Sequence, residues 1–298
     1  MAKTLIVILG PTAVGKTALG IELAKDFSTE IISADSRQFY KEMAIGTAKP
    51  TAKEMQGIKH HFIDFLSIEE NYTAGKFEKD ALNCLEGIFQ TKDMAIMIGG
   101  SGLYINAVCN GIDEIPEGNE EIRQQLNNKL EKEGIELLQK QLQELDAEYY
   151  TEVDVSNPRR LIRALEVCLT SDIPYSTLRK NSAKKRSFKI VKIGLHLERE
   201  ELYNRINNRA DLMIKNGLPA EAKKLYPFKT HNALQTVGYS ELFDYFDGKH
   251  SLEKAVELIK RNTRRYAKRQ LTWFRKDKEI EWFAPNELDA IEAHLKRS

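Results

Sequence analysis

The 298 residues suffice for a large core and a second structural unit, and their charges nearly cancel, with 45 Lys and Arg against 44 Asp and Glu. Because this balance excludes a protein-wide basic field, any nucleic-acid surface must be a local patch. The three cysteines lack the paired spacing of a zinc site or a disulfide framework, and no stretch approaches the roughly 18 apolar residues of a membrane span. We therefore expect a cytoplasmic protein that does not bind membranes. Separately, we expect a monomer.

Short apolar runs alternate with helical stretches over the first part of the chain. The apolar runs lie at residues 5–9, 30–33 and 95–98, and the helical patterns cover 16–27 and 74–91. Buried strands separated by helices are typical of a parallel sheet. The sequence thus predicts an α/β fold for this part.

A strongly charged stretch with apolar residues at helical spacing follows, from 117 to 152. Segments 114–119 and 180–187 have the composition of linkers on either side of it, and the apolar run 189–197 predicts a return to the sheet. We expect a P-loop-type parallel sheet core flanked by helices, made of residues 1–115 and 187–298 with a helical C-terminal part. Residues 116–186 are expected to form a small all-helical insertion domain.

The stretch "GPTAVGKT", residues 10–17, matches the consensus motif of a phosphate-binding loop between a strand and a helix. Gly10 and Gly15 allow the backbone to turn its N–H groups inward, Lys16 adds a positive charge, and Thr17 offers a hydroxyl to a magnesium ion. The motif predicts that an anionic phosphate chain binds here. It does not identify the molecule that carries the chain.

The acidic residue that kinases and NTPases usually place after a second strand is missing. The strand predicted at 95–98 runs into "GGSGLY", residues 99–104, where Ser101 supplies a hydroxyl. Asp35 instead follows the strand predicted at 30–33, at the carboxyl edge of the sheet where ligands bind. Turn or capping roles remain the alternatives for both segments.

Eight segments resemble, in order, the signatures of the bacterial tRNA dimethylallyltransferase family, also called tRNA isopentenyltransferases. They run from residue 10 to residue 276 and read "GPTAVGKT", "ISADSRQFYKEMAIGTAKP", "HHFID", "GGSGLY", "NPRRLIRALEV", "NGLPAE", "TVGYSE" and "KRQLTWFRK". The resemblance implies that the loop holds the diphosphate of dimethylallyl diphosphate. It also implies transfer of the dimethylallyl group to N6 of the tRNA adenosine on the 3′ side of the anticodon, with Mg²⁺ as cofactor and the anticodon stem-loop as partner.

The resemblance assigns roles to individual residues. Asp35 is the expected general base, Ser101 is expected to hydrogen-bond the leaving oxygen, and Lys16 is expected to stabilise the diphosphate, with Mg²⁺ at Thr17. Further diphosphate contacts are expected from the other loop residues and two helix arginines, which are Gly10, Pro11, Thr12, Ala13, Val14, Gly15, Arg205 and Arg209. Expected tRNA contacts are Asp35, Ser36, Arg37, Gln38, Ser101, Arg123, Arg159, Arg160, Leu161, Ile162, Arg163, Lys268, Arg269, Gln270, Leu271, Thr272, Trp273, Phe274 and Arg275.

Local basic patches favour a macromolecular acceptor. Residues 260–276 contain eight Lys or Arg and no acid, with Tyr266, Trp273 and Phe274 among them, and a smaller basic cluster lies at 184–186. A solvated helix face is the alternative for these residues and for Arg123. Two functions remain as rivals, a small-molecule kinase that uses ATP and a prenyltransferase that acts on free adenine nucleotides. For His60 and His61 we expect structural roles, since no third metal ligand is suitably spaced.

Overall fold

Six parallel strands form one sheet in the computed structural model, which describes residues 3–180 and 183–297. The strand order is β3-β2-β4-β1-β5-β6, so β1 lies in the middle and pairs with β4 and β5. The strands are β1 (Thr4–Leu9), β2 (Ile31–Ala34), β3 (His60–His61), β4 (Met94–Gly99), β5 (Lys189–Leu195) and β6 (Ile280–Phe283). The prediction of an α/β fold with a parallel sheet is confirmed.

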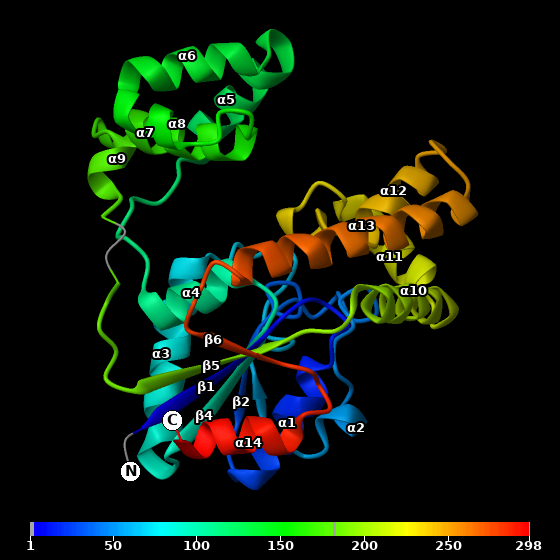
Figure 1. Cartoon of the computed structure of the whole chain (residues 1–298). Helices are drawn as coiled ribbons and strands as arrows, with labels where there is room; N and C mark the ends of the chain where they lie inside the picture. The colour runs from blue at the N-terminus through cyan, green and yellow to red at the C-terminus, as the bar shows by residue number, and fades with distance from the viewer. Residues whose placement is uncertain (1–2, 181–182, 298) are drawn as a thin grey trace. The chain divides into compact units, whose positions relative to one another are not determined.

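The two faces of the sheet bury alternate residues of β1. Leu5, Val7 and Leu9 belong to one hydrophobic cluster, whereas Ile6 and Ile8 belong to another. A strand that is covered on both faces reads as a continuous apolar run, which is why residues 5–9 show no polar alternation. Figure 1 shows α3 and α4 on one side of the strands and α1 and α14 on the other.

Helices cover both faces of this sheet and extend beyond it. In the unit formed by residues 3–109 and 186–297, a long helix, α13, packs along α10 and α12. The α-helices are α1 (Lys16–Asp26), α2 (Ala52–Met55), α3 (Ala74–Thr91), α4 (Gly102–Asn110), α10 (Arg199–Lys215), α11 (Leu218–Leu225), α12 (Tyr239–Phe246), α13 (Leu252–Phe274) and α14 (Leu288–Arg297). Two 3₁₀ helices lie at Tyr226–Phe228 and Asn232–Leu234.

In the second unit, residues 110–185, all the regular secondary structure of the described residues is helical. Its helices are α5 (Glu120–Glu133), α6 (Ile135–Leu145), α7 (Ala147–Glu152), α8 (Pro158–Ser171) and α9 (Tyr175–Leu178). The core of this unit includes Leu126, Leu138, Leu142, Leu161 and Leu165, each no more than 1% exposed.

The charged stretch 117–152 is three helices and not one. Gly134 ends α5 with a φ of 84°, and Asp146 separates α6 from α7 and caps α7 through its carboxylate. The Lys184 N–H donates to the Asn110 carbonyl at 2.7 Å, so the segments that enter and leave this unit run side by side. The expected exit linker includes Asn181 and Ser182, which lie outside the described residues. No helix in residues 3–180 or 183–297 is both long and apolar enough to cross a membrane.

Candidate active site

The phosphate-binding loop, residues 10–17, joins β1 to α1 at the carboxyl end of the sheet. Gly10 and Gly15 have φ angles of 145° and 112°, a region that L-amino acids rarely occupy. A Cβ at Gly10 would also lie 2.6 Å from the Leu195 carbonyl oxygen, so this glycine lets the loop approach the end of β5. The chain therefore has the strand–loop–helix arrangement in which backbone N–H groups and the positive end of α1 face a common ligand.

Lys16 is folded back on its own loop. Its Nζ donates to the carbonyl oxygens of Gly10 at 3.0 Å and Pro11 at 2.8 Å. Burial lowers the pKa of Lys16 to about 8, while the Asp35 carboxylate opposes the shift and the Arg209 guanidinium adds to it. Lys16 is thus a half-buried ammonium group on the cavity wall, and its charge is sensitive to an anion placed beside it.

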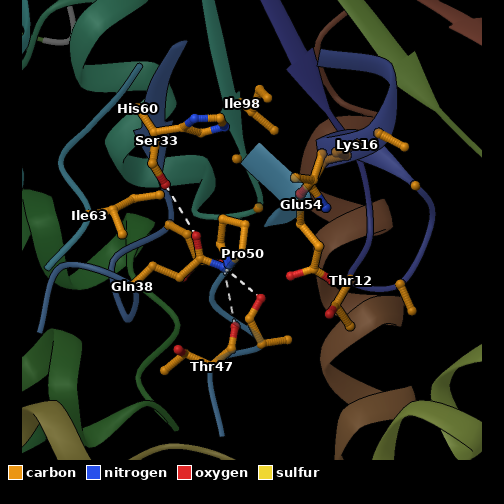
Figure 2. A pocket seen from close by; sticks show the side chains of 18 of the residues that line it. Thr12, Lys16, Ser33, Gln38, Thr47, Pro50, Glu54, His60, Ile63 and Ile98 are labelled. Atoms are coloured by element: carbon orange, nitrogen blue, oxygen red, sulfur yellow. Dashed lines mark hydrogen bonds between the residues drawn. The ribbon is translucent and has the colours of Figure 1, made fainter. Parts of the chain in front are cut away.

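A cavity of about 500 Å³ opens in front of the loop. Figure 2 shows Thr12, Lys16 and Glu54 on one side of it and Gln38 and His60 on the other. Its polar lining includes Thr12, Lys16, Thr17, Ser33, Asp35, Gln38, Thr47, Glu54, His60, Arg209, Tyr266 and Gln270. Its apolar lining includes Ala13, Ile21, Ile31, Pro50, Ile63 and Ile98. The cavity can therefore hold a ligand with an anionic end and a hydrocarbon end.

Asp35 and Ser101 follow the ends of neighbouring strands. Asp35 comes directly after β2, lines the cavity, and accepts the Arg37 N–H at 3.0 Å through one carboxylate oxygen. Ser101 comes after β4, and its Oγ accepts the Ser36 N–H at 3.1 Å. The Tyr266 hydroxyl interacts with Ser101, and burial raises the pKa of Tyr266 to about 12, with the Asp35 carboxylate adding to the shift. A carboxylate and two hydroxyl groups thus gather beside the phosphate loop.

Of the two expected helix arginines, only Arg209 lines the cavity. Its guanidinium donates to the Thr12 Oγ at 3.3 Å. Arg205 lies one turn earlier on α10, is exposed, and pairs with Glu201 at 2.8 Å. Spacing by four residues correctly put both on one helix face, but only the later position reaches the loop.

One wall of the cavity is held by the carboxylate of Glu221, on α11. This carboxylate accepts the backbone N–H groups of Ala44, Ile45 and Gly46 at 2.9 to 3.1 Å and the Tyr239 hydroxyl at 2.6 Å. The segment it holds continues into the cavity-lining residues 47, 48 and 50. Segments far apart in the sequence, "IGTAKP", "NGLPAE" and "TVGYSE", therefore form one support for the wall.

Helix α13 has two different faces near its C-terminal end. Gln270 and Phe274 are buried, Leu271 is half-buried, and the five other residues expected to contact tRNA are exposed, namely Lys268, Arg269, Thr272, Trp273 and Arg275. Four of these five line a second depression of about 220 Å³, together with Lys276. The Trp273 indole is 46% exposed and lies so close to Gly102 that a Cβ there would come within 2.3 Å of it. The basic segment is therefore partly an exposed surface and partly a wall of the cavity.

In the helical unit, the expected tRNA contacts also differ in exposure. Arg159 and Arg160 are exposed, whereas Leu161 and Ile162 are core residues at 0% and 7% exposure. Arg163 is half-exposed, and its guanidinium donates to Glu166, as described next. The arginine side chains can therefore contact a ligand, whereas the side chains of the two apolar residues cannot.

Arg123 and Arg163 share one carboxylate. Both donate to the same oxygen of Glu166, at 2.9 and 3.0 Å, and Glu166 is 0% exposed. Arg163 also donates to the Pro116 carbonyl at 2.8 Å. Arg123 is thus an exposed helix arginine whose guanidinium also pairs with a buried acid.

Two other features noted in the sequence have structural explanations. Arg186, in the basic cluster, has a side chain that is only 9% exposed and pairs with Glu78 at 2.8 Å, so it is not part of a free basic surface. His61 pairs with Glu30 at 2.6 Å, and His60 lines the cavity with its Nδ1 2.9 Å from the Ile58 carbonyl oxygen. In the described ranges, 3–180 and 183–297, no three His, Cys, Asp or Glu side chains are grouped to hold a metal ion.

Sequence reasoning missed several residues of the cavity. Glu54 and His60 belong to short elements, α2 and β3, that carry no periodic signal. Tyr266 had a usable signal, because it precedes the buried Gln270 by four residues and so lies on the same face of α13.

Comparisons with known proteins agree over nearly the whole chain. A family model described as IPP transferase matches residues 38–277. The tRNA dimethylallyltransferase of Christiangramia forsetii is 54% identical over 300 residues, which cover 99% of this chain and 99% of that protein. The tRNA dimethylallyltransferase of Flavobacterium johnsoniae is 52% identical over 287 residues, covering 94% of this chain and 93% of that protein.

Solved structures share the fold. The crystal structure of full-length tRNA isopentenylpyrophosphate transferase from Bacillus halodurans matches with a TM-score of 0.73 and 38% identity, covering 99% of this chain and 96% of that chain. A eukaryotic dimethylallyltransferase acting on tRNA matches with a TM-score of 0.78 and 27% identity, covering 99% of this chain and 77% of that one.

Proposed function

Because this chain belongs to the IPP transferase family, we propose that it is a tRNA dimethylallyltransferase. The proposed reaction moves the dimethylallyl group of dimethylallyl diphosphate to N6 of the tRNA adenosine on the 3′ side of the anticodon. One observation carries this proposal. The phosphate loop, the Asp35 carboxylate and an apolar lining meet in one cavity of about 500 Å³.

In the proposed reaction, the bond between C1 of the allyl group and the diphosphate oxygen breaks, and that oxygen keeps the electron pair. Lys16, Arg209 and the N–H groups of the loop stabilise the charge that collects on the leaving diphosphate. The Ser101 hydroxyl donates a hydrogen bond to the leaving oxygen. Since no phosphoryl group is transferred, the proposal requires no acid of the NTPase type after β4.

The residues present suit a magnesium ion held mainly by the substrate. Mg²⁺ prefers oxygen ligands, keeps several waters, and is commonly bound through one or two protein groups and substrate phosphates. The Thr17 hydroxyl lines the cavity beside Lys16 and is the group that would hold the ion. When bound, the ion neutralises negative charge on the diphosphate.

The acceptor is a weak nucleophile, because the N6 lone pair of adenine is delocalised into the ring. As the bond between N6 and C1 forms, a proton leaves N6, and Asp35 accepts it. General base catalysis of this kind contributes typically about 10² to 10⁴ in rate. The position of Asp35 on the cavity wall, at the end of β2, supports this role.

The tRNA is proposed to contact both units. The exposed cations Lys268, Arg269 and Arg275 suit phosphate contacts, and the exposed Trp273 ring suits stacking on an unstacked base. Arg123, Arg159, Arg160 and Arg163 of the helical unit are the further candidates. The adenosine must leave the stacked loop to reach Asp35, as in other base-modifying enzymes. The scheme uses one chain and needs no second copy.

The test is a transfer assay. We expect the protein, incubated with labelled dimethylallyl diphosphate, tRNA and magnesium, to yield prenylated adenosine on digestion of the tRNA. Parallel reactions replace the tRNA with AMP, or the prenyl diphosphate with ATP. Prenylation of AMP in place of tRNA would identify an adenylate prenyltransferase, and phosphorylation of a small molecule without prenyl transfer would identify a kinase.

A further inference from the structure

Gln270 joins two loops of the cavity. Its side-chain Oε1 accepts the Thr12 N–H at 2.9 Å, and its Nε2 donates to the Gly100 carbonyl at 2.9 Å. Thr12 belongs to the phosphate loop, and Gly100 to the loop after β4 that carries Ser101. Gln270 itself is only 6% exposed, in contrast to its neighbours Lys268 and Arg269. A single amide on α13 thus connects both loops from a buried position.

The two hydrogen-bond partners, the Thr12 N–H and the Gly100 carbonyl, permit only one orientation of the Gln270 side-chain amide. A backbone N–H can only donate and a backbone carbonyl can only accept, so the side chain at 270 must accept at one end and donate at the other. An amide does both. A carboxylate can only accept. An apolar side chain can neither donate nor accept, so it would leave two buried backbone groups without partners, which costs free energy of folding.

The surroundings leave little space for the amide to move. A Cβ at Gly100 would lie 2.3 Å from the Gln270 Nε2, so the glycine at this position is needed for the contact. Within the same loop, Lys16 donates to the carbonyls of Gly10 and Pro11. The first residues of the phosphate loop are therefore held by two side chains, those of Lys16 and of Gln270 on α13.

We propose that Gln270 is a positioning residue for the prenyl diphosphate site, which it sets by holding the phosphate loop and the Ser101 loop at a fixed separation from α13. Its side chain does not contact RNA. The inference rests on the proposed function in that dimethylallyl diphosphate is the ligand, and its readout is the binding of that ligand and not its transfer to tRNA. The helix whose exposed face carries Lys268 and Arg275 thereby also sets the geometry of the cavity.

The test compares two variants of Gln270 in the full chain. Gln270→Met removes both hydrogen bonds at similar volume, and Gln270→Glu keeps the acceptor and loses the donor. We expect each to bind dimethylallyl diphosphate with Mg²⁺ about 10-fold or more weakly at pH 7.5, the loss that one or two buried hydrogen bonds explain. The salt dependence of tRNA binding is expected to stay that of the unaltered chain.

A pH series separates positioning from general loss of structure. The carboxyl group introduced by Gln270→Glu could again donate to the Gly100 carbonyl once it is protonated. The ratio of Gln270→Glu affinity to unaltered affinity should therefore rise as pH falls from 7.5 to 5.5, while the ratio for Gln270→Met stays flat. The charged or titratable groups on the same cavity, Lys16, Asp35, Glu54, His60, Tyr266 and Arg209, are the same in all three proteins, so they largely cancel in the ratio.

Asn262→Asp is the matched control. It makes the same amide-to-acid change on α13, where Asn262 donates to Glu241 at 2.7 Å, away from both loops. We expect it to lower thermal stability without weakening prenyl diphosphate binding. Gly100→Ala should reproduce the Gln270→Met defect from the opposite side of the contact.

The outcomes are distinct. Unaltered prenyl diphosphate affinity in both Gln270 variants, or a flattened salt dependence of tRNA binding, would overturn the inference. Failure of the unaltered chain to prenylate tRNA would overturn the proposed function, while the binding measurements would still decide the role of Gln270.

Discussion

The half-buried ammonium group of Lys16 predicts a specific pH dependence of prenyl diphosphate binding. Burial lowers the pKa of this lysine to about 8 in the ligand-free protein. A lysine is charged below its pKa, so the protonated fraction falls from about 90% at pH 7 to about 10% at pH 9. If only the charged form binds well, apparent affinity falls in proportion to this fraction, about 10-fold or ~1.4 kcal/mol.

Calorimetry measures both the affinity for the ligand and the number of protons taken up on binding. We expect the affinity for dimethylallyl diphosphate with Mg²⁺ to fall about 10-fold between pH 7 and pH 9, since a phosphate group with a second pKa near about 6 is already ionised over this range. Binding at pH 8 should take up about half a proton, because a bound anion raises the pKa of Lys16. Buffers with different ionisation enthalpies detect that uptake.

Lys16→Arg is the control, because a guanidinium stays charged throughout this range. Its affinity should be lower or equal at pH 7 and then remain flat to pH 9. The reasoning is refuted if the unaltered protein binds equally well at both pH values, or if Lys16→Arg shows the same fall.

Three further changes test other parts of the site. Asp35→Asn should slow the transfer step by about 10² or more, with little change in tRNA binding, since an amide cannot take the N6 proton; single-turnover rates near those of the unaltered protein would exclude the base role. Lys268→Ala with Arg275→Ala should weaken tRNA binding and reduce the slope of log affinity against log salt concentration by about 0.9 per lost phosphate contact. The control is Lys254→Ala, because Lys254 is already paired with Glu257. Glu166→Gln should lower the free energy of unfolding of the helical unit by about 1–3 kcal/mol, because two guanidinium groups lose a buried charged partner; an unchanged thermal midpoint would contradict it.

The central strands were predictable because burial on both faces leaves an uninterrupted apolar run. β1, β2, β4 and β5 all lie where such runs stand in the sequence. The two edge strands were not predicted. β3 has only two residues, His60–His61, and β6, Ile280–Phe283, has an alternating pattern within a part of the chain that reads as helical. Edge strands are covered less, so their composition differs less from that of loops.

The local parts of the site were predictable, and its long-range parts were not. The phosphate loop and Asp35 follow strands directly, so their place at the carboxyl edge follows from chain order. The contact between Gln270 and Thr12 joins residues 258 positions apart, and no local pattern indicates it. Arg163 and Leu161 likewise differ in environment because one face of α8 packs in the core, although a family motif presents them as one segment.

The carboxylate of Glu221 has a consequence for the free energy of ligand binding. By accepting three successive backbone N–H groups, it orders residues 44–46, which lead into the cavity wall. Ordering a backbone residue costs about 1–2 kcal/mol of conformational entropy. For this wall, that entropy is lost when the chain folds, so the free energy of binding the proposed ligand does not include the cost of ordering these residues.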